Sequence, residues 1–129
     1  MEVKFMKMKN AMDFIYFYES IANENMPIDL AYKLMKIVNN LQQDRDFYTT
    51  ELNKIFEDCV VKEDDKFKLA PDKQQFVLKD GKKDEFEKRA NELQDIEVKF
   101  DERLKLDIQD FKGVSISPKN LTSIQEFFK

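Results

Sequence analysis

The sequence predicts an α+β fold in a single domain, residues 1–129. Two stretches alternate apolar with polar residues as strands do, and a heptad pattern of apolar residues runs through the middle of the chain as in a long helix. The chain has 129 residues and 42% apolar side chains, which is enough to bury one core without disulfides or metals. Only two glycines and three prolines are present, which disfavours an all-β fold with many tight turns.

The first 22 residues predict a strand followed by a helix. Residues 2–8 are rich in Val, Phe and Met and fit an opening strand. Asn10 is suited to cap the helix that follows, and Asp13 lies three residues later, where it can bind the exposed amides. The spacing of the apolar residues then predicts a helix over residues 11–22.

This helix carries an unusual number of aromatic residues, namely Phe14, Tyr16, Phe17 and Tyr18. One helix face can bury Phe14 and Tyr18, so we expect Tyr16 and Phe17 to be partly exposed. Exposed rings of this kind either remain at the surface or contact another protein. Tyr16 and Phe17 are therefore candidates for an interface.

Residues 27–60 predict one long helix without interruption, with Pro27 in the first turn, where proline is tolerated. Its apolar seam advances by alternating steps of four and three residues: Leu34, Val38, Leu41, Arg45, Tyr48, Leu52, Ile55 and Cys59. At 1.5 Å per residue the helix would be roughly 50 Å long. A compact domain of this size cannot cover such a length, so we expect the seam to meet another long helix, from this chain or from another copy.

Arg45 stands in this seam between Leu41 and Tyr48, at a position where an apolar residue is usual. In one interpretation its aliphatic stem packs while the guanidinium reaches water beside Asp44 or Asp46. In the other, the guanidinium pairs across an interface and fixes the register or the oligomeric state. Both interpretations stay open at this point.

The next part of the chain predicts a β-hairpin and a second helix. Residues 62–66 are polar and fit a turn, and the alternation in residues 67–69 and 76–78 predicts two strands with a five-residue connection. Residues 82–95 have helical spacing and form an antiparallel companion to the end of the long helix. The hairpin would then lie at the tip of the two helices.

Residues 96–108 predict a strand with one buried face, because the apolar residues fall on even-numbered positions and the polar residues on odd-numbered ones. Glu102 falls on the buried face, so we expect a bulge or bend there. The N-terminal strand is the natural partner. Together the two strands would form a small antiparallel sheet.

A short C-terminal helix is predicted to begin at Ser117 and Pro118, which fit the N-cap and the first helical position. The aromatic pair Phe127 and Phe128 follows at the end of the chain. These two rings dock either on the core or on a partner, and the sequence does not decide between the two.

The composition disfavours several classes of chemistry. The chain has no histidine, the commonest general base and metal ligand, and its one cysteine allows neither an internal disulfide nor a thiolate zinc cluster. Cys59 lies in the apolar seam, where we expect it to pack as a buried thiol. The acidic residues 63–65 fit a solvated turn and lack the spacing of a calcium loop. We therefore expect no enzymatic activity, no cofactor and no bound metal.

The charge and hydropathy of the chain bear on its partners. It carries 22 basic and 26 acidic residues, a net charge of −4, whereas nucleic-acid binders usually have a basic excess. Nucleic acid is therefore not an expected partner. No run of 18 apolar residues occurs, so we expect no membrane-spanning segment. The N-terminus lacks the apolar stretch of a signal peptide, which favours a cytoplasmic, reducing compartment.

Several segments carry a family resemblance that covers nearly the whole chain: Met26–Leu34, Phe76–Asp80, Asp84–Phe86, Glu97–Phe100, Gly113–Pro118 and the closing Phe127–Phe128. In this order they resemble a family of small proteins of unassigned function, of the DUF1617-like kind, that tailed bacteriophages and prophages encode. The resemblance implies a phage origin and a small accessory or structural role. It implies no catalytic residue, because the family offers none to transfer.

We expect the chain to act by binding protein: itself, another phage protein or a host protein. One hypothesis is a structural or assembly component of the virion that self-associates into a homo-oligomer through the coiled-coil seam and the aromatic helix. The alternative is a phage-encoded inhibitor of a host defence system in the host cytoplasm, such as an anti-CRISPR or similar anti-defence protein. The candidate interface residues are Tyr16, Phe17, Leu34, Leu41, Arg45, Tyr48, Phe127 and Phe128.

Overall fold

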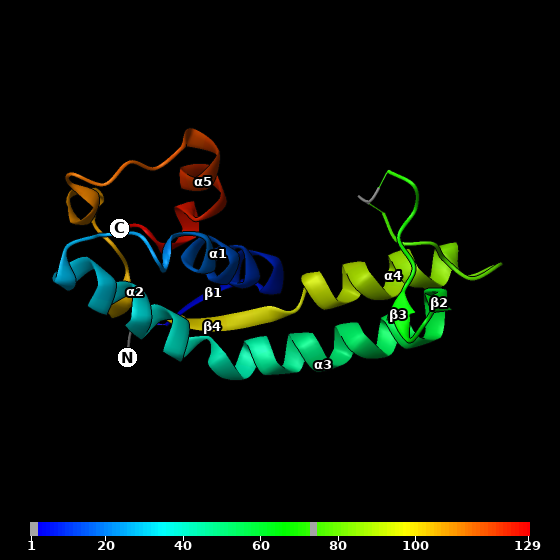
Figure 1. The fold of residues 1–129 in the computed structure, drawn as a ribbon. Helices are drawn as coiled ribbons and strands as arrows, with labels where there is room; N and C mark the ends of the chain where they lie inside the picture. Colours follow the sequence, from blue (N-terminus) through cyan, green and yellow to red (C-terminus); the bar gives the residue numbers. More distant parts are fainter. Residues whose placement is uncertain (1–2, 73–74) are drawn as a thin grey trace. The chain divides into compact units, whose positions relative to one another are not determined.

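The computed structural model describes residues 3–72 and 75–129 (Figure 1). These residues form five α-helices and two small antiparallel sheets of two strands each, so the fold class is α+β, as the sequence predicts. Where the sequence analysis expects one domain, the contacts divide the chain into two compact units. The first unit comprises residues 1–45 and 97–129, and the second comprises residues 46–96.

A two-stranded sheet joins the two sequence segments that make up the first unit. Strand β1 (Val3–Lys7) pairs antiparallel with β4 (Glu97–Asp101), with Val3 opposite Asp101 and Lys7 opposite Glu97. Met6, Val98 and Phe100 point to the buried side. The predicted pairing is confirmed. Residue 2, which the predicted opening strand included, lies outside the described residues.

Strand β4 ends much earlier than the sequence pattern indicates. The Asp101 side chain accepts a hydrogen bond from the Arg103 amide and so caps the 3₁₀-helix η1 (Glu102–Leu104). The expected bend at Glu102 therefore ends the strand. Beyond Glu102 the even-numbered residues are no longer all buried on one face. Leu106 is buried and forms a bridge with Phe128, whereas Ile108 is 57% exposed.

Helix α1 (Met8–Ile21) begins directly after β1. Lys7 occupies the N-cap position without a side-chain cap, and Asn10 lies inside the helix, so the predicted cap at Asn10 is wrong. Phe14 is buried as predicted. Phe17, which we expected to be partly exposed, is buried as well, because it lies three residues after Phe14 on the same side of the helix, with the two ring centroids 6.1 Å apart.

The predicted long helix is two helices, α2 (Ile28–Asn40) and α3 (Gln42–Cys59), and Leu41 separates them. Leu41 has φ −97° and ψ 3°, outside the helical range, although its amide still donates to the carbonyls of Ile37 and Val38. Its side chain is fully buried in the first unit. The expectation of one uninterrupted rod over residues 27–60 is therefore wrong at this residue.

The C-terminal part of the first unit contains three short helices, two of which begin at a side-chain cap. The Asp107 and Asp110 side chains form a capping box on η2 (Ile108–Phe111). Ser117 caps α5 (Pro118–Ser123) by accepting from the Asn120 amide, with Pro118 as the first helical residue, as predicted. The chain then passes through η3 (Gln125–Phe127) to its end.

The centre of the first unit is a group of aromatic rings. Phe127 has its ring centroid 4.4 Å from that of Phe14 on α1 and 4.9 Å from that of Phe100 on β4. All three side chains are fully buried. Of the two alternatives for the C-terminal aromatic pair, Phe127 therefore docks on the core of its own chain.

The second unit is built on residues 46–59 of α3 and on α4 (Lys83–Gln94), which run side by side (Figure 1). Cys59 at the end of α3 contacts Glu85 near the start of α4, whereas Ile55 packs with Leu93 near the end of α4. The helices are therefore antiparallel, as predicted. Their core is small: Ile55, Cys59 and Leu93 are buried, with Tyr48, Leu52 and Phe86 packed against them.

Short extended segments lie where these two helices meet, at the predicted place of the hairpin. Strands β2 (Lys62–Glu63) and β3 (Lys66–Phe67) pair within the stretch that we predicted as a polar turn, and Leu69 forms a bridge with Phe76. Three backbone hydrogen bonds close a ring: Val61 donates to Val77, Val77 to Lys68, and Lys68 to Val61. Residues 73 and 74 of the predicted connection lie outside the described residues.

Candidate functional site

Four of the eight residues predicted at an interface lie in the core of the first unit. Leu34, Leu41 and Phe127 have no exposed surface, and Phe17 is only 4% exposed. Their side chains contact apolar groups of their own chain, such as the Phe14 ring that packs against both Phe17 and Phe127. These four residues stabilise the fold and are not presented to a partner by the folded chain.

The other four residues lie at or near the surface. Tyr16 is 55% exposed on α1, and Phe128 is half-buried. Tyr48 packs against the small core of the second unit. Arg45 places its Nη2 atom 3.3 Å from Oε1 of Glu19 in the same unit, a partner that neither interpretation of Arg45 named. Exposed ion pairs of this kind contribute about 0–1 kcal/mol, so Arg45 is not a strong determinant of the fold.

An exposed apolar feature of the first unit that we did not predict lies on α2. Ile28 is 85% exposed, Tyr32 54% and Met35 41%. Their spacing of four and three residues places them on one face of the helix, and we call these three residues the α2 stripe. The opposite face of α2 is buried in the unit core through Leu30, Leu34, Ile37 and Val38.

The spacing of the α2 stripe was visible in the sequence. Residues 28, 32 and 35 repeat the steps of four and three that define the seam through residues 34, 38 and 41. A helix of 13 residues that carries two apolar faces has more apolar surface than one core can cover.

Charged residues flank the α2 stripe on one side. At 100° per residue, Asp29 and Lys36 are seven residues apart and lie along the same edge of the helix. The Lys36 ammonium nitrogen is 4.7 Å from the centroid of the Tyr32 ring, a cation–π contact. Lys33, farther round the helix, pairs with Asp110 over 2.6 Å, and this hydrogen bond raises the pKa of Lys33. The stripe is thus apolar with a mixed acidic and basic edge.

Basic side chains also gather where α2, η1 and the C-terminal residue approach one another in the first unit. A cavity of about 200 Å³ is lined by Leu104 and by the cations Lys33, Lys36, Arg103, Lys105 and Lys129. Acidic neighbours compensate several of these charges: Arg103 pairs with Asp101 and Lys105 with Glu102. The group is therefore a partly neutralised surface.

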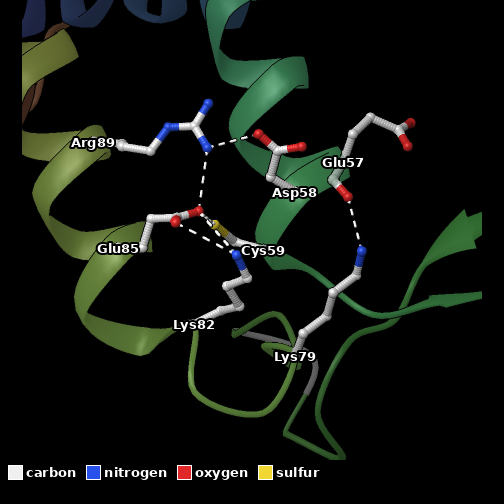
Figure 2. Close-up of polar contacts among 7 residues, drawn as sticks. All are labelled: Glu57, Asp58, Cys59, Lys79, Lys82, Glu85 and Arg89. Atoms are coloured by element: carbon white, nitrogen blue, oxygen red, sulfur yellow. Dashed lines mark hydrogen bonds and ion pairs between the residues drawn. The ribbon is translucent and has the colours of Figure 1, made fainter.

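The densest polar cluster in the second unit surrounds Cys59 (Figure 2). The thiol is fully buried and donates a hydrogen bond from Sγ to Oε2 of Glu85 over 3.2 Å. Arg89 lies one turn further along α4 and donates to Oε2 of Glu85 at 3.3 Å and to Oδ2 of Asp58 at 2.8 Å. Lys82 places its ammonium nitrogen 3.4 Å from Oε1 of Glu85. The Glu85 carboxylate thus holds together groups from both helices.

Lys79 donates two hydrogen bonds to carbonyl groups in the last turn of α3. The Lys79 ammonium donates to the Glu57 carbonyl at 3.0 Å, and the Lys79 amide donates to the Cys59 carbonyl at 2.8 Å (Figure 2). Carbonyls in the last turn of a helix have no partner within the helix, so these bonds satisfy acceptors that would otherwise need water. A cation at this helix end also interacts favourably with the helix dipole.

The protonation states in this cluster oppose catalysis by Cys59. Burial, followed by the hydrogen bond to Glu85, raises the pKa of the Cys59 thiol, so it remains protonated at neutral pH. The hydrogen bond from this thiol and the nearby cations Lys82 and Arg89 lower the pKa of Glu85. A buried neutral thiol is a poor nucleophile, and a carboxylate held ionised is a poor general acid. The cluster fits a structural link between α3 and α4.

The described residues, 3–72 and 75–129, contain no group of three His, Cys, Asp or Glu side chains arranged to hold a metal ion. Among these same residues, none of the helices combines the length and the apolar character needed to cross a membrane. The clearest surface with binding character in the first unit is therefore the α2 stripe with its charged edge.

No protein-family model matches this chain, and neither the curated proteins nor the solved structures contain a significant match. The resemblance to small phage proteins therefore stays a prediction.

Proposed function

We propose that this chain acts by binding protein, as a phage structural or assembly component that self-associates. The observation that supports this proposal is the α2 stripe, in which Ile28, Tyr32 and Met35 expose apolar surface on one helix face. Contiguous exposed apolar patches with a polar border are typical of protein–protein contact sites. An aromatic residue at the centre of such a patch is a common anchor.

The occupant of this surface in the proposal is a second copy of the chain. The charged edge beside the stripe carries both an acid, Asp29, and a base, Lys36, so a copy of the same helix offers a complementary charge for each. A single helix face buries less than the roughly 1,200 Å² of a standard stable interface. We therefore expect self-association with a dissociation constant in the micromolar range, which favourable local concentration in an assembly would promote.

The test is the molar mass of the pure chain as a function of concentration. Light scattering and sedimentation between about 1 and 500 μM should show a mass that rises from the 15.5 kDa of the monomer towards an oligomer. A monomer mass over this whole range contradicts the proposal. Mass spectrometry of purified particles of the encoding phage tests the assembly role: a fixed copy number supports it, and absence from the particles contradicts it.

A second candidate function is inhibition of a host defence system, and the distribution of charge favours it. Residues 46–96 hold 14 acidic and 10 basic side chains, whereas the rest of the chain holds 12 of each. The acidic excess therefore belongs entirely to the second unit. An acidic surface of this kind can occupy a basic channel that normally receives nucleic acid.

This second function is tested with purified CRISPR effector complexes of several types. We expect the chain to reduce DNA binding by one of them at micromolar concentration, and to lose this effect at high salt, because the attraction is electrostatic. Unchanged DNA binding by every complex contradicts the proposal. A chain that inhibits as a monomer supports this function over assembly.

A further inference from the structure

We propose that two copies pair through α2 in antiparallel orientation, with the α2 stripes interdigitated and with Asp29 of each copy facing Lys36 of the other. This inference rests on the proposed self-association and specifies its geometry. It makes the contact a closed two-fold dimer, in which the same surface of both copies is used and no open chain of subunits forms.

The spacing of the stripe supports the antiparallel orientation. Along the helix axis Tyr32 is about 6 Å from Ile28 and about 4.5 Å from Met35, at a rise of 1.5 Å per residue. A two-fold axis that crosses α2 between residues 32 and 33 places Met35 of the second copy level with residue 30, in the gap between Ile28 and Tyr32. The two Tyr32 rings then lie next to each other at the axis. Met35 of each copy thus fills the space between Ile28 and Tyr32 of the other.

The charges on the helix edge give the same register independently. With the axis between residues 32 and 33, a residue of one copy faces the residue of the other copy whose number brings the sum of the two numbers to 65. Asp29 of one copy therefore faces Lys36 of the other. In an antiparallel helix pair, equivalent edges of the two helices face each other, so the dimer gains two reciprocal Asp29–Lys36 pairs. In a parallel pair, this edge would face the opposite edge of the partner helix, where Ala31 carries no charge.

In the first unit the α2 stripe is exposed, and Lys36 at its edge can pair with an acidic side chain. Ile28, Tyr32 and Met35 keep 41–85% of their surface exposed. Lys33 is engaged by Asp110 at 2.6 Å, whereas Lys36 contacts only the face of the Tyr32 ring among the contacts described for its ammonium group. A carboxylate is a stronger hydrogen-bond acceptor than a ring face, so Asp29 of a second copy is a favourable partner for Lys36.

The first experiment places a charge in the stripe. We expect Ile28→Glu to raise the dissociation constant of the dimer at least roughly tenfold, because it buries a carboxylate opposite Met35 of the second copy. Ile108→Glu is the matched control, since Ile108 is also an exposed isoleucine of the first unit, 57% exposed, but lies on η2. Equal dissociation constants for wild type and Ile28→Glu overturn the inference.

The second experiment exchanges the edge charges. Asp29→Lys and Lys36→Asp should each weaken association about tenfold by placing like charges opposite one another, and the double variant should recover to within about threefold of wild type. Because Asp29 lies in the first turn of α2, where an acid is favourable, Lys36→Asp alone keeps the test valid if Asp29→Lys lowers the stability of the fold. A double variant no tighter than the single variants overturns the inference.

The third experiment determines the orientation of the two helices by crosslinking. Ile28→Cys and Met35→Cys chains, both with Cys59→Ser, are mixed and treated with a short bis-maleimide. The antiparallel pair should give the mixed 28–35 product in excess of the 28–28 product. If 28–28 products dominate, or if association persists without either product, this inference is overturned while self-association stands. A monomer at all concentrations overturns both.

Discussion

The thiol of Cys59 donates its hydrogen bond to the carboxylate of Glu85 across the two helices of the second unit, over 3.2 Å. Cys59 is the last residue of α3, and Glu85 lies in the first turn of α4. The bond therefore joins one helix end to the start of the next, where the carboxylate also interacts favourably with the helix dipole. Burial, followed by this contact, raises the pKa of the thiol, and the same contact lowers the pKa of the carboxylic acid.

Glu85 should make the stability of the chain sensitive to acid. Its pKa in the folded state lies below that of the unfolded state, about 4.3. The stability it contributes is thus fully present above about pH 4.3 and is lost as the pH falls through the folded-state pKa. Thermal unfolding between pH 7 and 2.5 should therefore show a smaller fall in Tm for Glu85→Gln than for wild type. Glu87→Gln, an exposed change on the same helix, should keep the wild-type slope, and equal slopes for all three chains would contradict the prediction.

Cys59 should be unreactive while the chain is folded. Burial raises the pKa of its thiol above the unfolded value of about 8.5, so its contribution to stability is fully present below about pH 8.5 and is lost as the pH rises through the folded-state pKa. We expect a thiol reagent at pH 8 to modify Cys59 only as fast as the second unit opens, and faster in urea. A chain with Ile108→Cys and Cys59→Ser supplies the exposed reference. Modification of native Cys59 at the rate of this reference would contradict the prediction.

Substitution of Leu41, the residue between α2 and α3, should lower the stability of the chain. Its side chain is fully buried, so Leu41→Ala should lower the free energy of unfolding by about 2–5 kcal/mol through lost burial and a new cavity. Ile108→Ala, at an exposed position, should change it by about 0.5 kcal/mol or less. Urea unfolding followed by circular dichroism measures both. A loss below about 1 kcal/mol for Leu41→Ala would show that this position is not part of a packed core.

Ser117 should stabilise α5, because its hydroxyl accepts a hydrogen bond from the Asn120 amide over 3.2 Å. Ser117→Ala should lower local stability by about 0.5–2 kcal/mol, the usual cost of losing an N-cap. Hydrogen exchange at the Asn120 amide should accelerate accordingly. Ser115→Ala removes a hydroxyl from an exposed residue two positions earlier and should leave this exchange rate unchanged.

Asp64 and Asp65 both have positive φ, 54° and 63°, in the turn between β2 and β3. A residue with a side chain is strained in this left-handed region, and glycine is not. Asp65→Gly should therefore stabilise the second unit by up to about 1 kcal/mol. Asp65→Ala removes the same charge but keeps the strain, so it should not stabilise. If both variants change the urea midpoint equally, charge and not backbone strain is the cause.

Patterns that depend on nearby residues were read correctly from the sequence. The alternation in β4 and the helical spacing of α4 are confirmed, as is the N-cap at Ser117 with Pro118 after it. These features follow from backbone geometry and from residues a few positions apart, which a sequence displays directly.

Local signals failed where one side chain had two plausible environments. Asn10 looks like a helix cap, but α1 begins at Met8 directly after β1, so Asn10 lies inside the helix. The seam through Leu41 looks continuous, but the backbone leaves the helical range at that residue, which a pattern of side chains cannot reveal. Phe17 looks as exposed as Tyr16 in the sequence, but the Phe17 side chain is buried and its ring lies beside that of Phe14.

The amino-acid pattern by itself determined the type of those elements that have a regular period, such as the strand β4 and the helix α4, because the spacing that defines each of them lies within a few residues. Only the tertiary structure decided which of two apolar faces of α2 is covered and which side chains meet from distant segments, as Cys59 meets Glu85 and Arg45 meets Glu19. The physical reason is that burial and pairing depend on the three-dimensional arrangement of elements, and a helix with two apolar faces is compatible with either being buried.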